Sequence, residues 1–266
     1  MDLAHFAEQS PFLAALAASV VAGTLATAAG ALPTLVVKGL SERATNLLLA
    51  FAAGVMLAAT VFSLLIPGLD AAQAMIGDRR LATLGMIAAL GGGGLLLWLV
   101  HRAVPHEHFC KGCEGEQSGR VARLWLFVIA IALHNVPEGA AVGIGAASGD
   151  LKVGLGVTLG IGLQNFPEGL AVAVGLMAAG YDRVPAFWLA AATGLLETIA
   201  GILGAGFVLL SASVLPWALG LAAGAMLFVI SGEVIPETHR AGFERGATAS
   251  LFLGFSVMLF LDTALL

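Results

Sequence analysis

The residues best suited to chemistry lie in two short motifs that repeat each other. Residues 133–139 read Leu-His-Asn-Val-Pro-Glu-Gly, and residues 163–169 read Leu-Gln-Asn-Phe-Pro-Glu-Gly. Each motif places a nitrogen or oxygen ligand four residues before its glutamate, and on an α-helix these two positions share a face. Imidazole, amide and carboxylate groups gathered in this way can hold a hard or borderline divalent cation.

The proline of each motif predicts a bend in its helix. Pro137 and Pro167 each precede the glutamate by one position. A proline inside a helix removes one backbone donor, kinks the helix and frees the carbonyl four residues earlier, here those of Leu133 and Leu163. Because both motifs lie in long apolar runs, we expect two kinked membrane helices that direct their polar groups to one point.

The composition indicates a membrane protein. The 266-residue chain is 59% hydrophobic and 11% charged, with a mean hydropathy of +0.97, whereas soluble domains average about 45–50% apolar and about 25% charged residues. We therefore predict an all-α fold, in a single transmembrane domain over residues 1–266, as a multi-pass protein of the cell's inner (plasma) membrane. The net charge of -5 says little about partners; we expect contact with the lipid bilayer and none with nucleic acid.

Eight apolar segments are each close to the ~20 residues that a helix needs to cross a bilayer. Most linkers between them are short, which favours antiparallel neighbours in a compact bundle, and one polar loop, at about 105–120, is longer. The predicted spans are residues 11–37, 44–69, 81–104, 121–147, 152–179, 185–210, 214–235 and 247–266.

The positions of lysine and arginine predict the orientation. Nine of these residues fall on one side of the predicted bundle and three on the other. Because cytoplasmic loops carry the excess of Lys and Arg, the nine-residue side, with the 105–120 loop, should be cytoplasmic. Eight spans then place both termini outside. The nine are Lys38, Arg43, Arg102, Lys111, Arg120, Arg123, Arg183, Arg240 and Arg245, and the three are Arg79, Arg80 and Lys152.

Three glutamates in the middle spans require an explanation. A charged side chain at the bilayer centre costs about 2.5–3.5 kcal/mol, so Glu138, Glu168 and Glu197 together would cost about 8–10 kcal/mol, comparable with the stability of a whole domain. No buried Lys or Arg is available in these spans to pair with them. Protonated glutamates that bridge helices around a core His134 would explain each residue singly, but the repeated spacing favours a bound metal ion.

With these features the chain resembles the ZIP family of zinc/iron-regulated transporter-like proteins, in particular its bacterial members. The two motifs, in the fourth and fifth of eight spans, carry the resemblance, which covers nearly the whole chain. It extends to residues 51–59 (Phe-Ala-Ala-Gly-Val-Met-Leu-Ala-Ala), residues 105–108 (Pro-His-Glu-His) and residues 233–240 (Glu-Val-Ile-Pro-Glu-Thr-His-Arg).

The resemblance implies a binuclear metal centre halfway across the membrane. Its first site would be built by Met56, His134, Glu138, Gln164 and Glu168. Its second would be built by Asn135, Glu138, Asn165, Glu168 and Glu197, with Glu138 and Glu168 bridging the two ions. Adjacent helix positions such as 134 and 135 point about 100° apart and can serve two neighbouring sites, and bridged metal ions lie about 3.5–4 Å apart.

The chain departs from the family pattern at two positions. Position 165 is Asn where some family members have Asp, which removes one negative charge from the second site, so we expect Asn165→Asp to tighten metal binding there. Position 232 is Gly, before Glu233, where a His can stand, and this puts an imidazole-assisted inner exit route in doubt.

The ligand types favour Zn²⁺ as the transported substrate, and Cd²⁺, Fe²⁺, Mn²⁺ and Co²⁺ are also compatible with them. No organic cofactor is expected. The thioether of Met56 is a soft ligand that would favour Cd²⁺, although Met56 also fits the pattern of an ordinary packing residue.

Further candidate ligands lie near the two membrane surfaces. At the outer mouth, Asp70 and Asp262 would attract cations or simply be solvated acids. At the inner mouth, Glu233, Glu237 and His239 would form a release path, with the last two at the water boundary.

The predicted cytoplasmic loop carries its own set of candidate ligands. His106, His108, Cys110 and Cys113 lie within eight residues of one another. They would make a four-ligand Zn²⁺ site for metal capture or sensing in a reducing cytoplasm. The alternative is a loop whose Cys pair has no metal role.

The main functional prediction is uptake of divalent metal toward the cytoplasm. The family resemblance also implies a homodimer and an elevator-type movement, in which spans one, four, five and six slide against the others; Gly154, Gly156, Gly162 and Gly194 would then provide smooth faces at the sliding boundary. One alternative is an intramembrane metalloenzyme with Glu138 or Glu168 as general base for a metal-bound water, although no His-Glu-x-x-His or Gly-x-Ser-x-Gly motif occurs. Another is a metal-sensing receptor without flux.

Overall fold

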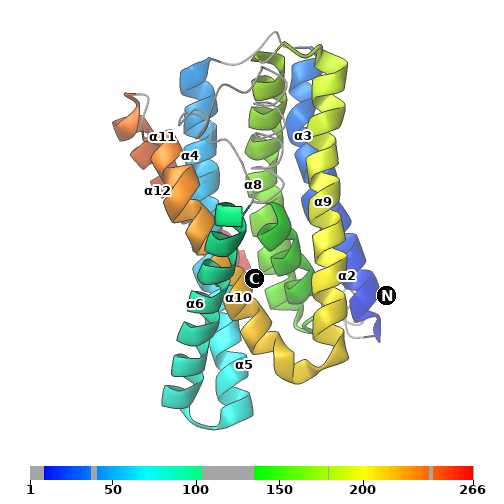
Figure 1. Cartoon of the computed structure of the whole chain (residues 1–266), viewed down its shortest axis with the longest axis vertical. Helices are drawn as coiled ribbons and strands as arrows, with labels where there is room; N and C mark the ends of the chain where they lie inside the picture. The colour runs from blue at the N-terminus through cyan, green and yellow to red at the C-terminus, as the bar shows by residue number, and fades with distance from the viewer. Residues whose placement is uncertain (1–8, 37–40, 104–134, 179, 240–241, 266) are drawn as a thin grey trace.

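The computed structural model describes residues 9–36, 41–103, 135–178, 180–239 and 242–265, and all regular secondary structure in these ranges is helical (Figure 1). The predicted all-α fold is therefore confirmed. Several long helices change type along their length, so that α-helical turns alternate with short π- or 3₁₀-helical segments.

The elements follow the order of the predicted spans. Span one consists of α2 (Pro11–Ser19), η1 (Val20–Leu25), α3 (Ala26–Ala31) and η2 (Leu32–Leu35). Span two consists of α4 (Glu42–Ala59), η3 (Thr60–Leu65) and α5 (Ile66–Ile76), and span three is α6 (Arg79–Ala103). The described part of span four is a helix over residues 135–146.

The second half of the chain continues this pattern. Span five is α8 (Leu151–Ala178) and span six is α9 (Arg183–Leu210), which is followed by the short turn η4 (Ala212–Val214). Span seven consists of α10 (Leu215–Val229), η5 (Ile230–Val234) and α11 (Ile235–Thr238). Span eight consists of α12 (Glu244–Phe260) and η6 (Leu261–Leu265).

Six stretches are helices long and apolar enough to cross a membrane, and they correspond to predicted spans one, two, three, six, seven and eight. The fifth span, α8, is a helix of 28 residues, and the first part of the fourth lies outside the described residues. The count of eight spans and the outside location of both termini therefore remain predictions. The six are Pro11–Leu35, Glu42–Ile76, Arg79–Val100, Arg183–Leu210, Leu215–Thr238 and Glu244–Ala264.

Span two extends beyond its predicted end at residue 69, because its helix ends at a glycine turn and not where the apolar run ends. Helix α5 ends at Gly77, which adopts a left-handed conformation with φ 79° that only glycine enters without strain. The next residue, Asp78, starts α6 by accepting hydrogen bonds from the amides of Arg80 and Leu81 at 2.7 and 3.1 Å.

Consecutive helices alternate in direction (Figure 1), so the charged helix ends sort into two sets. Arg43, Arg102, Arg183 and Arg245 mark what we call the inner end. Arg79, Arg80 and Lys152 mark the outer end. The other five Lys and Arg residues of the orientation count lie outside the described residues.

The helices pack in two groups. The motif group consists of α2 to η2, the helix over residues 135–146, α8 and α9, and in it α8 packs along α3 and α9. The companion group consists of α4 to α5, α6, α10 to α11, and α12, and in it α4 packs along α12 and α10 along α6. The two groups meet where α4 packs on α8 (Figure 1).

Glycines bring helix backbones into contact inside each group. A Cβ atom added at Gly143 would overlap the backbone of Gly201 in the motif group. One added at Gly54 would overlap the carbonyl oxygen of Leu251 in the companion group. Small residues permit this close approach of membrane helices, so each group is tightly joined.

Glycines at the boundary between the groups meet side chains instead of backbone. A Cβ atom at Gly160 would lie 2.8 Å from the terminal methyl of Met258, and one at Gly156 would lie 2.8 Å from Oδ1 of Asp262. Gly156 thus lies at the boundary as predicted. In contrast, Gly154, Gly162 and Gly194 have their nearest neighbours in their own group, at Ala146, Ala22 and Gly23, so their prediction as boundary residues is wrong.

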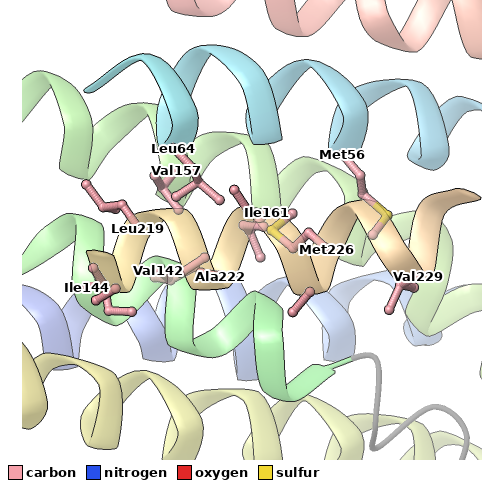
Figure 2. Packing of buried hydrophobic residues seen from close by; sticks show 14 of the residues in the cluster. Met56, Leu64, Val142, Ile144, Val157, Ile161, Leu219, Ala222, Met226 and Val229 are labelled. Carbon is pink, nitrogen blue, oxygen red and sulfur yellow. The ribbon is translucent and has the colours of Figure 1, made fainter. Parts of the chain in front are cut away.

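An apolar cluster fills the boundary. Figure 2 shows its side chains converging from α4 and η3, α8, α10 and the helix over residues 135–146. Leu64, Leu219 and Met226 of the companion group pack in one cluster with Val157 and Ile161 of α8. All five are at most 1% exposed, so this part of the boundary is dry.

Prolines account for two of the π-helical segments. Pro67 and Pro236 lie in the first turn of the α-helices that follow η3 and η5. Because proline has no amide hydrogen, it interrupts the regular hydrogen-bond ladder. The amide of Ile66 accordingly donates to Val61, five residues earlier. Such π-helical turns occur frequently at functional sites.

Candidate metal centre

The described motif residues are buried near the middle of the motif group. Asn135 and Glu138 are each 1% exposed, Gln164 is 0% exposed, and Asn165 and Glu197 are each 1% exposed. Those on α8 and α9 lie close to the midpoints of these helices. Glu168 is partly buried, and His134 lies outside the described residues.

The last glycine of each motif presses its helix against a neighbour. A Cβ atom at Gly139 would overlap the carbonyl oxygen of Glu197 on α9, and one at Gly169 would overlap that of Thr27 on α3. The two motifs therefore pack in the same way, the first on span six and the second on span one. The contact at Gly139 also explains how Glu197 comes close to the first motif.

The three glutamates lie close enough for their negative charges to interact. Glu138 interacts electrostatically with Glu168 and Glu197, and Glu197 with Glu168. The basic residues of the described parts of these helices, Lys152 and Arg183, stand at helix ends. Buried like charges need a counter-charge or protons, and a bound cation would supply the former.

Among the described residues, four buried oxygen atoms in this cluster have no hydrogen-bond partner of good geometry: Oδ1 of Asn135, both carboxylate oxygens of Glu138, and Oε1 of Gln164. Buried polar atoms are almost always paired. The Asn135 amide is oriented by its Nδ2, which donates to the carbonyl oxygen of Thr193 at 3.1 Å. Carboxylate and amide oxygens are suitable ligands for a borderline or hard divalent cation, so these atoms are the strongest candidates for contact with one.

The carboxylates do not complete a site without the amides. Among the described residues, no group of three or more His, Cys, Asp and Glu side chains could hold a metal ion. The amide oxygens of Asn135 and Gln164, with the imidazole of His134 outside the described residues, would have to complete the ligand set.

Asn165 is bound quite differently from Asn135. Its Nδ2 donates to both carboxylate oxygens of Glu197, at 2.7 Å each, and to the carbonyl oxygen of Ala22 at 2.7 Å. Its Oδ1 accepts a hydrogen bond from Nε2 of Gln164 at 2.6 Å. The family resemblance implies that Asn165 and Glu197 are metal ligands and does not reveal this bond, because spacing along one helix does not show which groups of other helices face it.

The two predicted ligands from the companion group lie in different surroundings. Met56 is 3% exposed and belongs to the apolar cluster, and Figure 2 shows its side chain directed from α4 toward α10, on the side of Val229. Glu233 is 9% exposed in η5, which packs against α4. Apolar packing thus describes the position of Met56, and a ligand role for either residue remains a prediction.

Asp70 and Asp262 line a single cavity at the outer end of the bundle. The cavity has a volume of about 680 Å³ and is also lined by Asp150 and Lys152. Oδ1 of Asp262 accepts a hydrogen bond from Ser63 at 2.8 Å. Sequence reasoning missed Ser63 and Asp150; for Ser63 a signal was available, because the proline four residues later opens the helix at this point.

The apolar cluster separates this cavity from the motif residues. Along α8, Val153 lines the cavity, Val157 and Ile161 belong to the cluster, and Gln164 follows. At 1.5 Å per residue, Val153 and Gln164 lie about 16 Å apart along the helix. A dry barrier therefore stands between the outer cavity and the candidate centre.

His239 is held by its own neighbours at the inner end. Its Nδ1 lies 2.9 Å from the carbonyl oxygen of Ile235, and its Nε2 lies 3.0 Å from Oγ1 of Thr248. Because a carbonyl oxygen only accepts, Nδ1 carries a hydrogen in this arrangement. A role for His239 in metal release would require these bonds to break and remains a prediction, as does the role of Glu237.

The remaining candidate ligands belong to the predicted cytoplasmic loop. His106, His108, Cys110 and Cys113 lie outside the described residues, together with the whole 105–120 loop. The predicted metal capture by this loop is therefore untested.

These observations first define a class of protein. Helices long enough to cross a membrane hold carboxylate and amide oxygens that have no partner among the described residues deep in the bundle, and a carboxylate-lined cavity lies at one end. This combination is typical of a membrane protein that handles cations.

Comparisons with known proteins then define the family. A family model described as ZIP Zinc transporter matches residues 101–262. The chain is 49% identical over 244 residues to "Zinc transporter ZIPB" of Bordetella bronchiseptica, which covers 92% of this chain and 79% of that protein. It is 45% identical over 252 residues to "Zinc transporter GufA" of Myxococcus xanthus, covering 95% and 99%, and 32% identical over 219 residues to "Zinc transporter ZupT" of Corynebacterium aurimucosum, covering 79% and 82%.

The chain belongs to the ZIP zinc transporter family, and the predicted resemblance is confirmed. It is a multi-pass membrane protein. The relatives are named transporters rather than enzymes, so the metalloenzyme alternative receives no support from them. The homodimer implied by the resemblance remains a prediction.

Proposed function

We propose that the protein carries Zn²⁺ toward the cytoplasm across the cell's inner membrane, through a metal centre formed by its two motifs. The observation that carries this proposal is the set of unpaired buried oxygens on Asn135, Glu138 and Gln164. Zinc is favoured because the relatives are named zinc transporters. Cd²⁺, Fe²⁺, Mn²⁺ and Co²⁺ suit the same ligand types and are further proposed substrates.

The proposed ligand set would neutralise the charge of the ion and still allow the ion to dissociate. Glu138 and Glu168 would neutralise the two charges of the ion, and His134 would add the imidazole that Zn²⁺ prefers. Asn135 and Gln164 are neutral, so they would complete the coordination without making the ion too strongly bound to leave.

The proposed path begins at the outer cavity. Its three carboxylates, Asp70, Asp150 and Asp262, would concentrate cations there by their electrostatic field. The apolar cluster around Leu64 and Ile161 would then stop free diffusion of a hydrated ion toward the centre. Transport would require the centre to move relative to this barrier.

We propose an elevator-type movement of the motif group against the companion group. Backbone contacts at glycines join the helices inside each group, as at Gly143 and Gly54. Glycines at the boundary, such as Gly160, meet flexible side-chain ends instead. Each group could therefore move as a unit, because sliding would disturb side chains at the boundary and leave the backbone contacts intact.

The test is uptake of radioactive zinc by the purified protein in liposomes. The intact protein should show saturable uptake. Glu138→Gln, Glu138→Ala and His134→Ala should reduce it by more than about 100-fold, because even the outer-shell partners of metal ligands typically contribute 10–100-fold. The matched control is Glu244→Gln, which removes an equally charged side chain from the exposed start of α12 and should leave uptake within about twofold of the intact protein.

Two results would contradict the proposal. The first is zinc binding by the intact protein without uptake, which would indicate a receptor. The second is unchanged uptake by Glu138→Gln, which would remove the first motif from the path.

A further inference from the structure

The asparagines of the two motifs occupy equivalent positions but present opposite atoms to the centre. In the first motif, Nδ2 of Asn135 is bound to the backbone of Thr193, and its buried Oδ1 has no partner in the part of the chain that the structure describes. In the second motif, Nδ2 of Asn165 is bound to Glu197, and its Oδ1 is already bound by Gln164. Asn135 therefore offers an oxygen to a cation, and Asn165 offers hydrogens to a carboxylate.

The orientation of the Asn165 amide follows from its surroundings. An amide nitrogen has two hydrogens to donate and an amide oxygen has none. The carbonyl oxygen of Ala22 can only accept, and it lies 2.7 Å from the amide nitrogen. On its other side the amide oxygen faces Nε2 of Gln164, which can only donate. If the amide of Asn165 were turned over, its oxygen would face the carbonyl oxygen of Ala22, so that two acceptors would meet. Its nitrogen would face Nε2 of Gln164, so that two donors would meet.

The π-helical segment of span one supplies the acceptor that fixes this orientation. The amide of Ala26 would bind the carbonyl of Ala22 in a regular α-helix, but in η1 it binds Val21 and Gly23 instead. The carbonyl oxygen of Ala22 is thereby released from the helix ladder and accepts from Asn165. One amide hydrogen is used there, and the other is shared between the two oxygens of Glu197.

The bond to Glu197 performs the task that a second metal ion would otherwise perform. The second site of the binuclear centre implied by the family resemblance needs Oδ1 of Asn165 and a carboxylate oxygen of Glu197 to point at one ion. An N–H group lies between these residues instead, so its partial positive charge stabilises the carboxylate. A second ion would have to displace this hydrogen bond and turn the amide away from both Ala22 and Gln164.

From this arrangement we infer that Asn165 is a positioning residue that closes the second metal site through Glu197, so that the centre binds one zinc ion per chain. The inference rests on the proposed function, because it concerns the same centre. The ion would be held by the first motif with Gln164 and Glu168, and Glu197 would serve as the partner of Asn165.

The experiment is a zinc titration of the purified full-length protein, with the bound metal counted by elemental analysis after removal of free Zn²⁺. We expect one tightly bound zinc per chain for the intact protein. Asn165→Asp has nearly the same shape but lacks the donating nitrogen, so it should bind two. Gln73→Glu is the control, because it adds the same charge in α5, outside the centre, while the Asn165–Glu197 bond stays in place, and it should bind one.

X-ray absorption of the zinc-loaded proteins provides a second measurement. A metal–metal distance near 3.5 Å, typical of bridged ions, should appear in Asn165→Asp and be absent from the intact protein and from Gln73→Glu. The intact protein alone decides the stoichiometry if the variant does not fold.

The outcomes separate this inference from the proposed function. Two zinc ions in the intact protein would overturn the inference and leave the transport proposal standing. One ion in both the intact protein and Asn165→Asp would remove Asn165 as the cause. No bound zinc in the intact protein would contradict the proposed function itself.

Discussion

The two helical groups place their polar interactions at different depths. In the motif group, Asn135 and Asn165 make their hydrogen bonds to neighbouring helices deep in the bundle. In the companion group, Asn46 binds the carbonyl of Thr238 at the inner end and Ser63 binds Asp262 in the outer cavity. The middle of the companion group is instead apolar, with residues such as those of the boundary cluster.

This difference suggests that the two groups have separate roles in the proposed transport. A cation deep in a bilayer needs oxygen ligands on one side, and those lie in the motif group. The companion group presents an apolar surface to them, which in the proposed mechanism would block free passage of water and ions. The strongest test of these separate roles is to prevent the two groups from sliding against each other.

A disulfide across the boundary should have the largest effect. The Cβ atom of Ala59 lies 3.1 Å from the position of a Cβ atom at Gly160, close to the range of about 3.5–4.5 Å found in disulfides. In a chain with Cys110 and Cys113 replaced by Ser, oxidation of Ala59→Cys with Gly160→Cys should abolish zinc uptake, because it ties α4 to α8. Reduction should restore the uptake.

The control disulfide lies inside the companion group. The Cβ atom of Ala89 is 2.8 Å from a Cβ position at Gly220, and oxidation of Ala89→Cys with Gly220→Cys should leave uptake close to that of the reduced protein. Normal uptake by the cross-linked boundary pair would show that the groups do not slide.

Substitution inside the motif group should cost stability as well as uptake. A side chain at Gly139 has no space against the carbonyl of Glu197, so Gly139→Ala must push two helices apart at the centre. Overpacking of this kind costs about 1–3 kcal/mol or more. Thermal unfolding in detergent should show the loss, together with strongly reduced zinc uptake.

Gly206 provides the matched control for this prediction. It lies on α9, and a Cβ atom there would meet no other atom within 4 Å. Because alanine is favoured over glycine in a helix by about 1 kcal/mol, Gly206→Ala should match or slightly exceed the stability of the intact protein. Equal losses for the two variants would show that the contact at Gly139 is unimportant.

The smallest effect should come from the outer cavity. Asp262→Asn keeps the hydrogen bond from Ser63 possible but removes one of the charges that line the cavity. Weaker electrostatic attraction should raise the KM for zinc by about tenfold or less, while the maximal rate stays within about twofold. A lower maximal rate at unchanged KM, measured in liposomes, would instead indicate that Asp262 takes part in the movement.

The fold could be predicted from the sequence where the length of an apolar segment determines it. In the described residues, the predicted spans correspond to helices, since about 20 apolar residues can be satisfied in a bilayer only as a helix. The extension of α5 to Ile76 was not predicted, because it is set by a glycine turn rather than by hydropathy. The partition into two groups was also hidden, because it depends on which helices pack together, as at Gly143 and Gly201.

The candidate site was predictable in its residues and less so in its geometry. The two motifs mark polar residues in long apolar runs, and Glu138 and Gln164 are indeed buried, whereas their role as ligands remains a prediction. The bond between Asn165 and Glu197 was missed because it joins two helices and depends on the carbonyl released by η1. A π-helical turn has no clear sequence signature when, as in η1, no proline follows it.

The central claim is that zinc is held by the oxygens and the imidazole of the two motifs. X-ray absorption at the zinc edge of the intact protein, loaded with one equivalent of Zn²⁺, tests it most directly. The account predicts nitrogen and oxygen ligands at about 2.0–2.2 Å and no thiolate sulfur at about 2.3 Å. A thiolate sulfur shell at that distance would contradict it, because the ion would then be bound by the Cys110 and Cys113 pair instead of the motifs.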